Sequence, residues 1–552
     1  MLLRLVPWLT VAAFLLPVAA GLLGTVLPAV GYFPALGGER FSLAPLRSLL
    51  EQPGLGKSVA VTLISGFAST LAAFATSTAF CAATHDSRLF RWARYLFTPK
   101  LAAPHAAVAI GTAFLLAPSG WLARLFTPWL TGWERPPDVS IVHDEWGMCM
   151  AFGLALKEIP FLVLMTMSAL NQVRSSENLA VARSLGYGPA TAWMKTVFPQ
   201  VYPQIRLPVY AVLAFSLSVV DVAIILGPTN PPPLAAYVFR LFSHRDLAMQ
   251  FPAAAGAMLQ LGLVAAGIGV WRLAELAVSR LFRGWLTAGS RGGGVPVGRV
   301  WAWSALGMCT GAAVLGAAVM GVWSLARSWW FPAALPSRWT LDNWSRHLDN
   351  LADPFWTTVV VGCAATGLAL VLVLGCLENE DRHRVRTERR ALWLLYVPLL
   401  VPQIGFLFGL QVVLVRLGVD GGLGAVVWSH LLFVLPYVFL ALADPWRSKD
   451  ERYARTAACL GCPPRRVFLR VKLPMLLRPV LFAAAVGFAV SVAQYLPTVF
   501  AGAGRQATLT TEAVTLSTGA DRRVIGVYAF VQAALPMLVY LAAVGLPGRR
   551  RE

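Results

Sequence analysis

Two stretches, RSLGYGPATAWMKTVFP (183–199) and ACLGCPPRRVFLRVKLP (458–474), are polar, glycine-broken inserts in a chain that is otherwise mostly apolar. Each contains Leu-Gly and then a proline 13 residues after the glycine. The two glycines, Gly186 and Gly461, are separated by almost exactly half of the 552-residue chain. This spacing predicts an internal duplication, in which each half of the chain forms the same structural unit.

The rest of the chain has the composition of a membrane protein. It is 57% hydrophobic and 13% charged, about half the charge of an ordinary soluble protein, and its mean hydropathy is +0.65. Apolar runs long enough to cross about 30 Å of hydrocarbon as helix recur throughout. We expect an all-α polytopic membrane protein with about 12 transmembrane helices, at residues 5–30, 58–84, 101–119, 146–170, 205–227, 251–273, 300–324, 355–377, 391–415, 424–443, 476–500 and 524–546.

The net charge of +20 is unevenly distributed along the chain. If the N-terminus is cytoplasmic, 31 of the 46 Lys and Arg residues fall on the cytoplasmic side, counting three at the cytoplasmic ends of spans (Arg206, Arg272 and Arg478); 14 fall outside and one, Lys157, lies deep within a span. This asymmetry follows the positive-inside rule, so it indicates topology and not a nucleic-acid partner. We therefore predict that both termini are cytoplasmic, that 5–30 is a retained span, and that the chain ends in the basic tail 549–551.

Other landmarks repeat at nearly the same spacing as the two glycines. Ile159-Pro160 corresponds to Leu435-Pro436, and FSLSVVDV from Phe215 corresponds to FAVSVAQY from Phe488. Parallel six-span repeats are a common way to build a pathway between two halves. We expect two tandem six-helix domains, a basic glycine-rich cytoplasmic linker between them, and one cytoplasmic insert between the fourth and fifth spans of each domain. The expected boundaries are 1–279 and 300–552 for the domains, 280–299 for the linker, and about 171–200 and 444–474 for the inserts.

Each insert is predicted to be a helix, a glycine and a second helix. Ser175 or Ser176 in the first copy, and Ser448 with Glu451 in the second, have the spacing of helix-capping residues. The glycine of each copy then ends this helix in a left-handed conformation. The prolines that follow are expected to start the second helix and to mark re-entry into the membrane; they are Pro189, Pro463 or Pro464, Pro199 and Pro474.

The second helix of each insert carries apolar residues that are unfavourable in water. Trp193 and Met194 in one copy, and Phe468 and Leu469 in the other, lie beside a basic residue. Apolar anchors on a short protruding helix suit docking into a groove of another protein, which we favour over a plain solvated loop. The residues expected to make this contact are Ala182, Leu185, Gly186, Trp193, Met194, Lys195, Pro199, Ala457, Leu460, Gly461, Phe468, Leu469, Arg470 and Pro474.

The inserts resemble the cytoplasmic coupling loops of binding-protein-dependent ABC importer permeases. The family pattern is Glu-Ala-Ala, three residues, Gly, and about nine or more residues before a proline that follows an apolar residue. The matching residues are 180–182, Gly186, Phe198 and Pro199 in the first copy, and 455–457, Gly461, Leu473 and Pro474 in the second. The family's glutamate is replaced by Ala180 and Arg455, and the nearest acids, Glu177 and Glu451, lie about one turn upstream.

This resemblance covers essentially the whole chain and is closest to the fused two-domain permeases of thiamine and ferric-iron import systems. PLLVPQIGFLFGL (398–410) and TLTTEAVTLSTGADRR (508–523) look especially like an uncharacterised thiamine-permease-like subgroup. The resemblance implies a type I ABC importer permease of a bacterial inner membrane that passes a small solute inward. The implied partners are a periplasmic binding protein and two copies of a cytoplasmic ATPase, which would carry ATP and Mg.

Ionisable residues inside the predicted spans are costly unless they face a cavity or each other. Lys157 and Glu158 lie in the fourth span, and Asp221, in the fifth, is placed to neutralise Lys157. We expect these residues either to line a translocation path or to form a structural ion pair that locks two helices. Gln403 and Gln494 complete the candidate path as hydrogen-bonding groups.

The chain itself is expected to hold no catalytic, metal or cofactor site. EQPGLGKS (51–58) lacks the first glycine of a P-loop and leads into a span from the predicted outer side. Cys459 and Cys462 have no second Cys or His pair nearby to complete a zinc site. The alternative function is a proton-coupled secondary transporter with six plus six spans. A third possibility, a scaffold without transport, is disfavoured because it would not need a duplicated docking loop.

Overall fold

The computed structural model describes residues 2–85, 87–292, 297–383, 398, 400–519 and 521–545. Nearly all the regular structure in these residues is helical, and the strands among them form one short antiparallel pair, β1 (Ala326–Ser328) with β2 (Arg338–Trp339). The predicted fold class, an all-α polytopic membrane protein, is therefore confirmed.

The helices fall into two series, one before and one after residues 293–296. The first series is α1 (Leu2–Ala29), η1 (Pro34–Leu36), α2 (Ala44–Leu50), α3 (Leu55–Thr84), α4 (Arg88–Phe97), η2 (Pro99–Ala102), α5 (His105–Leu116), α6 (Trp121–Phe126), α7 (Met148–Leu170), α8 (Ser175–Ser184), α9 (Pro189–Ala192), η3 (Trp193–Val197), α10 (Phe198–Ser218), α11 (Asp221–Leu226), α12 (Leu234–Phe242), η4 (Leu247–Met249) and α13 (Gln250–Thr287). The second series is α14 (Val297–Leu325), α15 (Asp342–His383), α17 (Ile404–Arg416), α18 (Leu423–Arg447), α19 (Glu451–Cys459), α20 (Pro464–Val467), η5 (Phe468–Lys472), α21 (Leu473–Met475), α22 (Leu477–Val492), α23 (Leu496–Gly502), α24 (Leu509–Ser517) and α25 (Arg522–Gly545).

Among the described residues, nine helices are long and apolar enough to cross a bilayer, and they coincide with nine of the twelve predicted spans. The exceptions are the fifth, ninth and eleventh predictions. Residues 391–397 and 399 of the ninth lie outside the described part of the chain, and α17 forms a 13-residue helix in the remainder. The fifth and eleventh are interrupted helices.

The two interruptions occupy corresponding places in the two halves. In the fifth predicted span α10 ends at Ser218 and α11 begins at Asp221; in the eleventh α22 ends at Val492 and α23 begins at Leu496. Each break frees backbone groups from the helical hydrogen-bond ladder. Such irregular backbone is tolerated at membrane depth only where it is buried in protein or lines a cavity.

Buried side chains supply the missing hydrogen bonds. The Gln260 side-chain amide, on α13, donates to the Leu217 carbonyl at 2.9 Å. In the second half the Thr510 hydroxyl donates to the Val492 carbonyl, and Gln532 on α25 donates to the Thr510 hydroxyl at 2.8 Å. Apolar length predicts the place of these two spans but does not reveal that they are interrupted, because the partners that satisfy the breaks are distant in the sequence.

The half-chain repeat recurs in the local geometry. When Gly186 is aligned with Gly461, the π-helical turn η3 coincides with η5, α9 begins at the same position as α20, and α12 at the same position as α24. A threonine on a long helix of each half accepts a hydrogen bond from the first N–H of the same short helix, Thr62 from Leu234 at 2.8 Å and Thr358 from Leu509 at 2.9 Å. The duplicated sequence therefore forms duplicated structure.

The first helix of each half packs against the other half. α1 lies along α17 and α15, and α14 lies along α5 and α3. Both crossings bring glycines into close backbone approach: Gly21 and Gly24 meet Gly409, and Gly111 meets Gly316. Small residues permit such approach, which stabilises helix pairs where lipid gives no hydrophobic driving force. The halves are interlocked by an exchange of helices.

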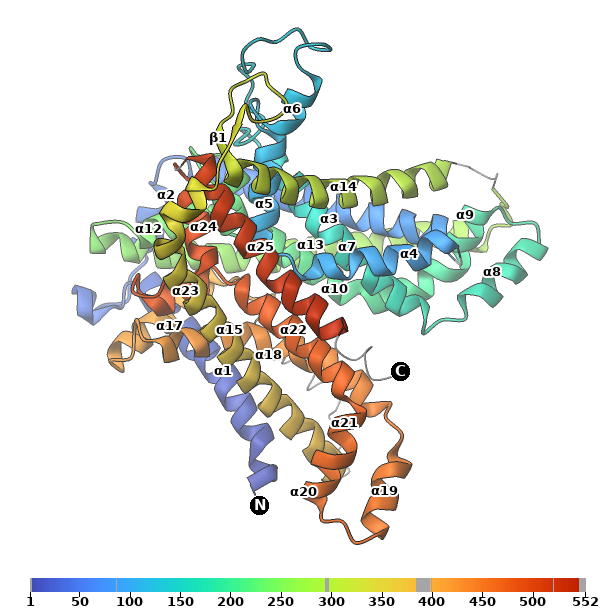
Figure 1. The fold of residues 1–552 in the computed structure, drawn as a ribbon. Coiled ribbons are helices and arrows are strands. Elements are labelled where there is room, and N and C mark those ends of the chain that lie inside the picture. Colours follow the sequence, from blue (N-terminus) through green and yellow to red (C-terminus); the bar gives the residue numbers. More distant parts are fainter. Residues whose placement is uncertain are drawn as a thin grey trace.

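Figure 1 shows two helical bundles that meet near α12, α23 and α24 and spread apart toward α8 and α19. The blue helix α1 lies beside α15 and α17, in agreement with the exchange. The two inserts are therefore at the separated ends of the bundles, with the interrupted helices nearer to the region where the bundles meet.

The segment between the two helical series is shorter than the predicted linker. α13 continues to Thr287, beyond the predicted end of the sixth span at 273, so the first part of 280–299 is helical. Residues 293–296 of that linker, and the basic tail 549–551, lie outside the described residues. The boundaries 1–279 and 300–552 stay predictions.

Replacing Gly409 by alanine is expected to loosen the α1–α17 crossing. A Cβ there would lie 2.0 Å from the Gly21 carbonyl oxygen, so the backbones must separate. Overpacking of this kind costs about 1–3 kcal/mol, which outweighs the higher helix propensity of alanine. The measurement is the thermal unfolding midpoint of the purified protein.

Gly367→Ala is the matched control, because Gly367 lies within α15 and a Cβ there meets no atom within 4 Å. It should leave the midpoint unchanged or raise it slightly. A Gly409→Ala protein as stable as the Gly367→Ala protein would contradict the proposed role of this crossing.

Candidate functional site

Each insert reverses direction at its glycine. Gly186 has φ +84° and Gly461 has φ +79°, a left-handed conformation that residues with a Cβ rarely adopt. α8 and α19 end just before these glycines, and α9 and α20 begin just after them. The predicted helix, glycine and helix are confirmed, and we call these two units, residues 175–199 and 450–474, the first and second coupling segments.

The second helix of the first coupling segment continues into the membrane helix, whereas that of the second ends at Met475, where the chain bends by 76° before α22. In the first segment α9, η3 and α10 follow one another without a break from Pro189 to Ser218, so the predicted re-entry point at Pro199 lies inside continuous helix. Pro199 has no N–H, and its ring would clash with the carbonyl of Lys195, one turn earlier. The π-helical turn η3 widens the helix at that place, and η5 does the same before Pro474.

The predicted helix caps are wrong in both coupling segments. α8 has no side-chain cap at its first turn, and the Ser175 hydroxyl instead bonds to His85 Nε2 at 2.8 Å. α19 is capped by Asp450, whose carboxylate accepts the Arg452 N–H at 2.9 Å. The Ser448 hydroxyl donates to the Pro445 carbonyl, because α18 extends as far as Arg447 and Ser448 closes that helix.

The predicted exposure of Trp193 is also wrong. Its side chain is 1% exposed and packs against Phe198, with 5.7 Å between the ring centroids. Since η3 continues into a membrane helix, its inner face must join the core, and Ala182 on α8 is buried by the same packing. Phe468 is half-buried, with its ring centroid 6.2 Å from that of Trp446.

Other apolar residues of the coupling segments are exposed. Those of the first are Val181, Leu185 and Met194, and those of the second are Tyr453, Leu460 and Leu469. The glycines, prolines and Arg470 of the predicted contact set are also exposed, while Ala457 is half-buried. The accessible apolar surface therefore centres on the glycine turns and not on the tryptophan.

Lys195 anchors the first coupling segment to the end of α13. Its ammonium donates to the Ala288 carbonyl at 2.6 Å and lies over the rings of Trp285 and Tyr187, at 4.7 and 5.3 Å from their centroids. Its charge is thus directed into the protein. Lys195 holds the segment in place and is less available to a partner than the sequence predicts.

The family glutamate is replaced on α19 by Arg455, which forms an ion pair with Glu451 at 2.6 Å. The Arg455 guanidinium holds the pKa of the Glu451 carboxyl below its usual range, chiefly through this hydrogen bond. The nearest upstream acid of this segment is therefore already paired within its own helix.

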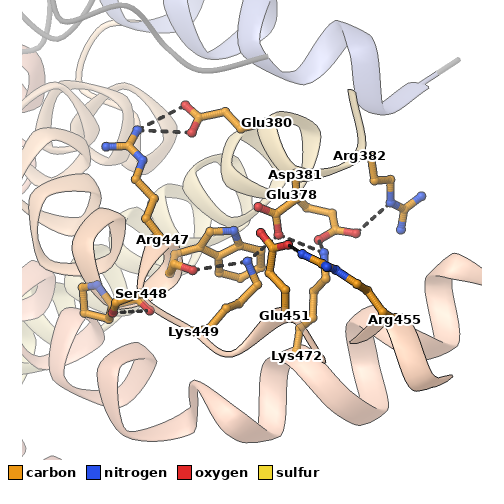
Figure 2. Close-up of polar contacts among 12 residues, drawn as sticks. Glu378, Glu380, Asp381, Arg382, Arg447, Ser448, Lys449, Glu451, Arg455 and Lys472 are labelled. Atoms are coloured by element: carbon orange, nitrogen blue, oxygen red, sulfur yellow. Dashed lines mark hydrogen bonds and ion pairs between the residues drawn. The ribbon is translucent and has the colours of Figure 1, made fainter. Parts of the chain in front are cut away.

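The second coupling segment is also tied to two long helices by charged side chains (Figure 2). Lys472, the last residue of η5, donates to Glu378 at 2.7 Å and to Asp381 at 2.9 Å, both near the end of α15. Lys449 donates to the same Asp381 oxygen at 2.5 Å. Both ammonium groups lie over Trp446 on α18, at 5.8 and 4.8 Å from its ring centroid.

Lys157 is not paired with Asp221. Its ammonium donates to three backbone carbonyls around the end of η2, those of Lys100 at 2.9 Å, Leu101 at 3.1 Å and Ala103 at 2.6 Å. The predicted neutralisation of Lys157 by Asp221 is therefore wrong, since carbonyls that η2 leaves free satisfy the ammonium. Lys157 fixes α7 to η2.

Glu158 and Asp221 gather around His105. His105 Nε2 lies 3.2 Å from Glu158 Oε1, and the imidazole also lies within electrostatic range of the Asp221 carboxylate. Tyr437 and Tyr495, both of the second half, lie within electrostatic range of Glu158 and Asp221, respectively. This acidic cluster lies beside the break between α10 and α11.

Gln494 lies in the corresponding break of the second half. Its amide donates to the Val490 carbonyl at 3.1 Å, and its buried Oε1 has no hydrogen-bond partner among the described residues. Gln403 lies at the start of α17 and is half-buried. His430, in contrast, is fully satisfied by Ser491 and Thr498, each at 2.8 Å.

Known proteins of similar sequence are transport permeases. Residues 371–547 match the family of binding-protein-dependent transport system inner membrane components. The chain is 32% identical over 535 residues to the inner membrane ABC transporter permease protein YnjC of Escherichia coli (strain K12), covering 97% of this chain and 94% of that protein.

Shorter similarities involve two further permeases. The molybdenum transport system permease protein ModB of Mycobacterium bovis is 30% identical over 27% of this chain and 59% of its own length. The putrescine transport system permease protein PotI of Escherichia coli (strain K12) is 23% identical over 24% of this chain and 50% of its own length.

Trp193→Ala is expected to lower the thermal unfolding midpoint strongly. Truncation of a fully buried tryptophan leaves a cavity and costs about 3–5 kcal/mol. Met194→Ala is the control, because the neighbouring Met194 side chain is 39% exposed and its truncation should leave the midpoint nearly unchanged. Equal effects of the two substitutions would contradict the assignment of Trp193 to the core.

Proposed function

This chain belongs to the family of ABC transporter permeases, and we propose that it is the fused transmembrane subunit of an importer. In this proposal a small solute passes from a periplasmic binding protein to the cytoplasm, and a separate ATPase supplies the energy. The observation that supports it most is the pair of helix–glycine–helix coupling segments at the separated ends of the two bundles. One chain with two such segments offers two equivalent docking places.

The proposed ATPase contact is the exposed apolar surface at the two glycine turns. Leu185 and Leu460 lie at the glycine turns, and Met194 and Leu469 lie on η3 and η5, which follow them. Apolar anchors of this size suit a groove on a partner, and two copies of the ATPase would use the two turns. We propose 1–279 and 300–552 as the two permease domains, each with one docking place, and a cytoplasmic location for both termini.

For the solute we propose a small organic cation, as expected for a permease of the thiamine type. The acidic cluster of Glu158 and Asp221 lies beside the broken helix of the first half, where broken helices of transporters commonly form binding sites. The Lys157 ammonium donates to carbonyls around η2 and its charge also acts on the neighbouring Glu158, so it can offset at most one of the two carboxylate charges. Carboxylates at membrane depth favour a cation, and Tyr437 and Tyr495 can add ring faces to it.

The docking proposal is tested by co-purification with a cytoplasmic ABC ATPase from the same organism, which is the expected partner. The wild-type chain should retain it, and Gly186→Pro with Gly461→Pro should lose it, because proline cannot adopt the positive φ of either turn. Gly418→Pro with Gly504→Pro, at positive-φ turns outside the coupling segments, is the control for general damage.

Retention of the ATPase by a correctly inserted Gly186→Pro, Gly461→Pro protein would reject the docking proposal. Uptake that follows a proton gradient and needs no ATPase would favour the secondary transporter instead. The assay is solute uptake into proteoliposomes with and without ATP.

The solute proposal is tested with Asp221→Asn and Glu158→Gln. Each removes one negative charge from the acidic cluster while keeping the side-chain shape, so ATP-dependent uptake of thiamine should fall at least about tenfold. Asp420→Asn is the control, because Asp420 pairs with Arg505 and does not belong to the cluster. Unchanged uptake in both cluster variants would reject the cation path.

A further inference from the structure

The two coupling segments are held by different interactions, although their backbones match. The second carries a compact group of charges where η5 meets the ends of α15 and α18, which we call the Lys472 clamp. The clamp consists of Glu378, Asp381, Trp446, Lys449 and Lys472.

We propose that the Lys472 clamp transmits the movement of the second coupling segment to α15, with Lys472 as the positioning residue. This inference rests on the proposed function, because it concerns how a docked ATPase would move the membrane helices. In Figure 2 the clamp joins the labelled residues of α15 to Lys472 and Lys449, and Arg382 adds a further contact to Glu378 at 2.7 Å.

Most of the clamp is shielded from water. The side chains of Glu378, Lys449 and Lys472 are 5%, 4% and 11% exposed, and that of Asp381 is 23% exposed. Ion pairs in such surroundings are screened little by salt, and separating their partners would leave unpaired charges in a medium of low polarity. Purely apolar contacts can slide past one another at smaller cost. The clamp therefore resists movement of η5 relative to α15.

α15 extends from the clamp to the opposite side of the molecule. It is one continuous helix of 42 residues, about 60 Å long at 1.5 Å per residue. At its other end Asn343 donates to the carbonyls of Ser324 and Ala326, both at 3.0 Å, next to β1. A displacement of the second coupling segment would thus reach the far surface through a single helix.

The residues at the corresponding positions of the first half are different. With the two coupling glycines aligned, Lys472 corresponds to the buried Val197, and Lys449 corresponds to Arg174, which is exposed. On α3 the positions of Glu378 and Asp381 are Ala82 and His85, counted from the matched threonines Thr62 and Thr358. His85 bonds to Ser175 at 2.8 Å, so the two buried lysine–carboxylate pairs of the clamp are not repeated at these positions.

This difference predicts unequal roles for the two segments. The second, held by charges, would carry the tighter link between ATP hydrolysis and helix movement. The first, held by apolar packing and by Lys195 on the Ala288 carbonyl, can shift relative to its helices. The two coupling segments would therefore contribute unequally to the coupling of ATP hydrolysis to helix movement.

The test uses the full complex of this chain, its ATPase and its binding protein in proteoliposomes. Lys472→Met should keep the ATPase bound and leave its basal hydrolysis within twofold of wild type. Hydrolysis stimulated by the loaded binding protein, and solute uptake, should fall at least about tenfold. Lys472→Arg keeps a cation between both acids and should restore most of the stimulation.

Two comparisons between variants separate a loss of coupling from a general loss of protein stability. Lys449→Met should reduce stimulated hydrolysis, while the matched first-half variant Arg174→Met should not. Asp381→Asn keeps the Lys472–Glu378 pair and is the milder variant if Lys472→Met does not fold; it too should lower the ratio of stimulated to basal hydrolysis.

Folded Lys472→Met and Asp381→Asn complexes with wild-type stimulation would overturn the clamp proposal and leave the proposed function standing. Failure of both variants to fold would assign the clamp a structural role only and would also overturn it. A wild-type chain that binds no ATPase would overturn the proposed function itself.

Discussion

Close backbone contact between helices of opposite halves is the constraint on which the rest of this structure depends. At the crossing of α1 with α17 the absence of side chains on Gly21, Gly24 and Gly409 lets two backbones touch, and Thr25 accepts the Gly409 N–H at 3.1 Å. The crossing of α14 with α5 has the same kind of close backbone contact, between Gly316 and Gly111. Halves joined in this way cannot separate without breaking both contacts.

Polar residues at membrane depth divide into two groups according to their hydrogen-bonding and ionic partners. Gln260, Gln532 and Lys157 bind backbone carbonyls or the groups that satisfy them, so they maintain the irregular backbone that a membrane would otherwise forbid. Glu158 and Asp221 are different, because among the described residues neither forms a direct ion pair with a lysine or an arginine; His105 lies 3.2 Å from Glu158 and within electrostatic range of Asp221. The first group makes the broken helices possible, and the second places carboxylates beside the break between α10 and α11.

The sequence predicts those features that depend on a few neighbouring residues. Nine spans follow from apolar length, and the left-handed glycines follow from the Leu-Gly repeat, because each property is local. Partners distant in the chain escape this reasoning: the burial of Trp193 depends on a helix that continues into the membrane, and the pairing of Lys472 with Glu378 joins residues 94 positions apart. One clue was available, since Lys472 replaces Val197 in an otherwise apolar position of the repeat.

The exchange of first helices also bears on how the protein is made. α1 leaves the ribosome first, yet its contact at Thr25 lies 384 residues from the Gly409 N–H that completes it. At about 5–20 residues per second, α1 must wait roughly 20–80 s in the membrane before that partner has been synthesised. During this time its glycine face is open to any other helix nearby. Because both halves belong to one chain, the helix that completes this contact is always synthesised in the same molecule as α1.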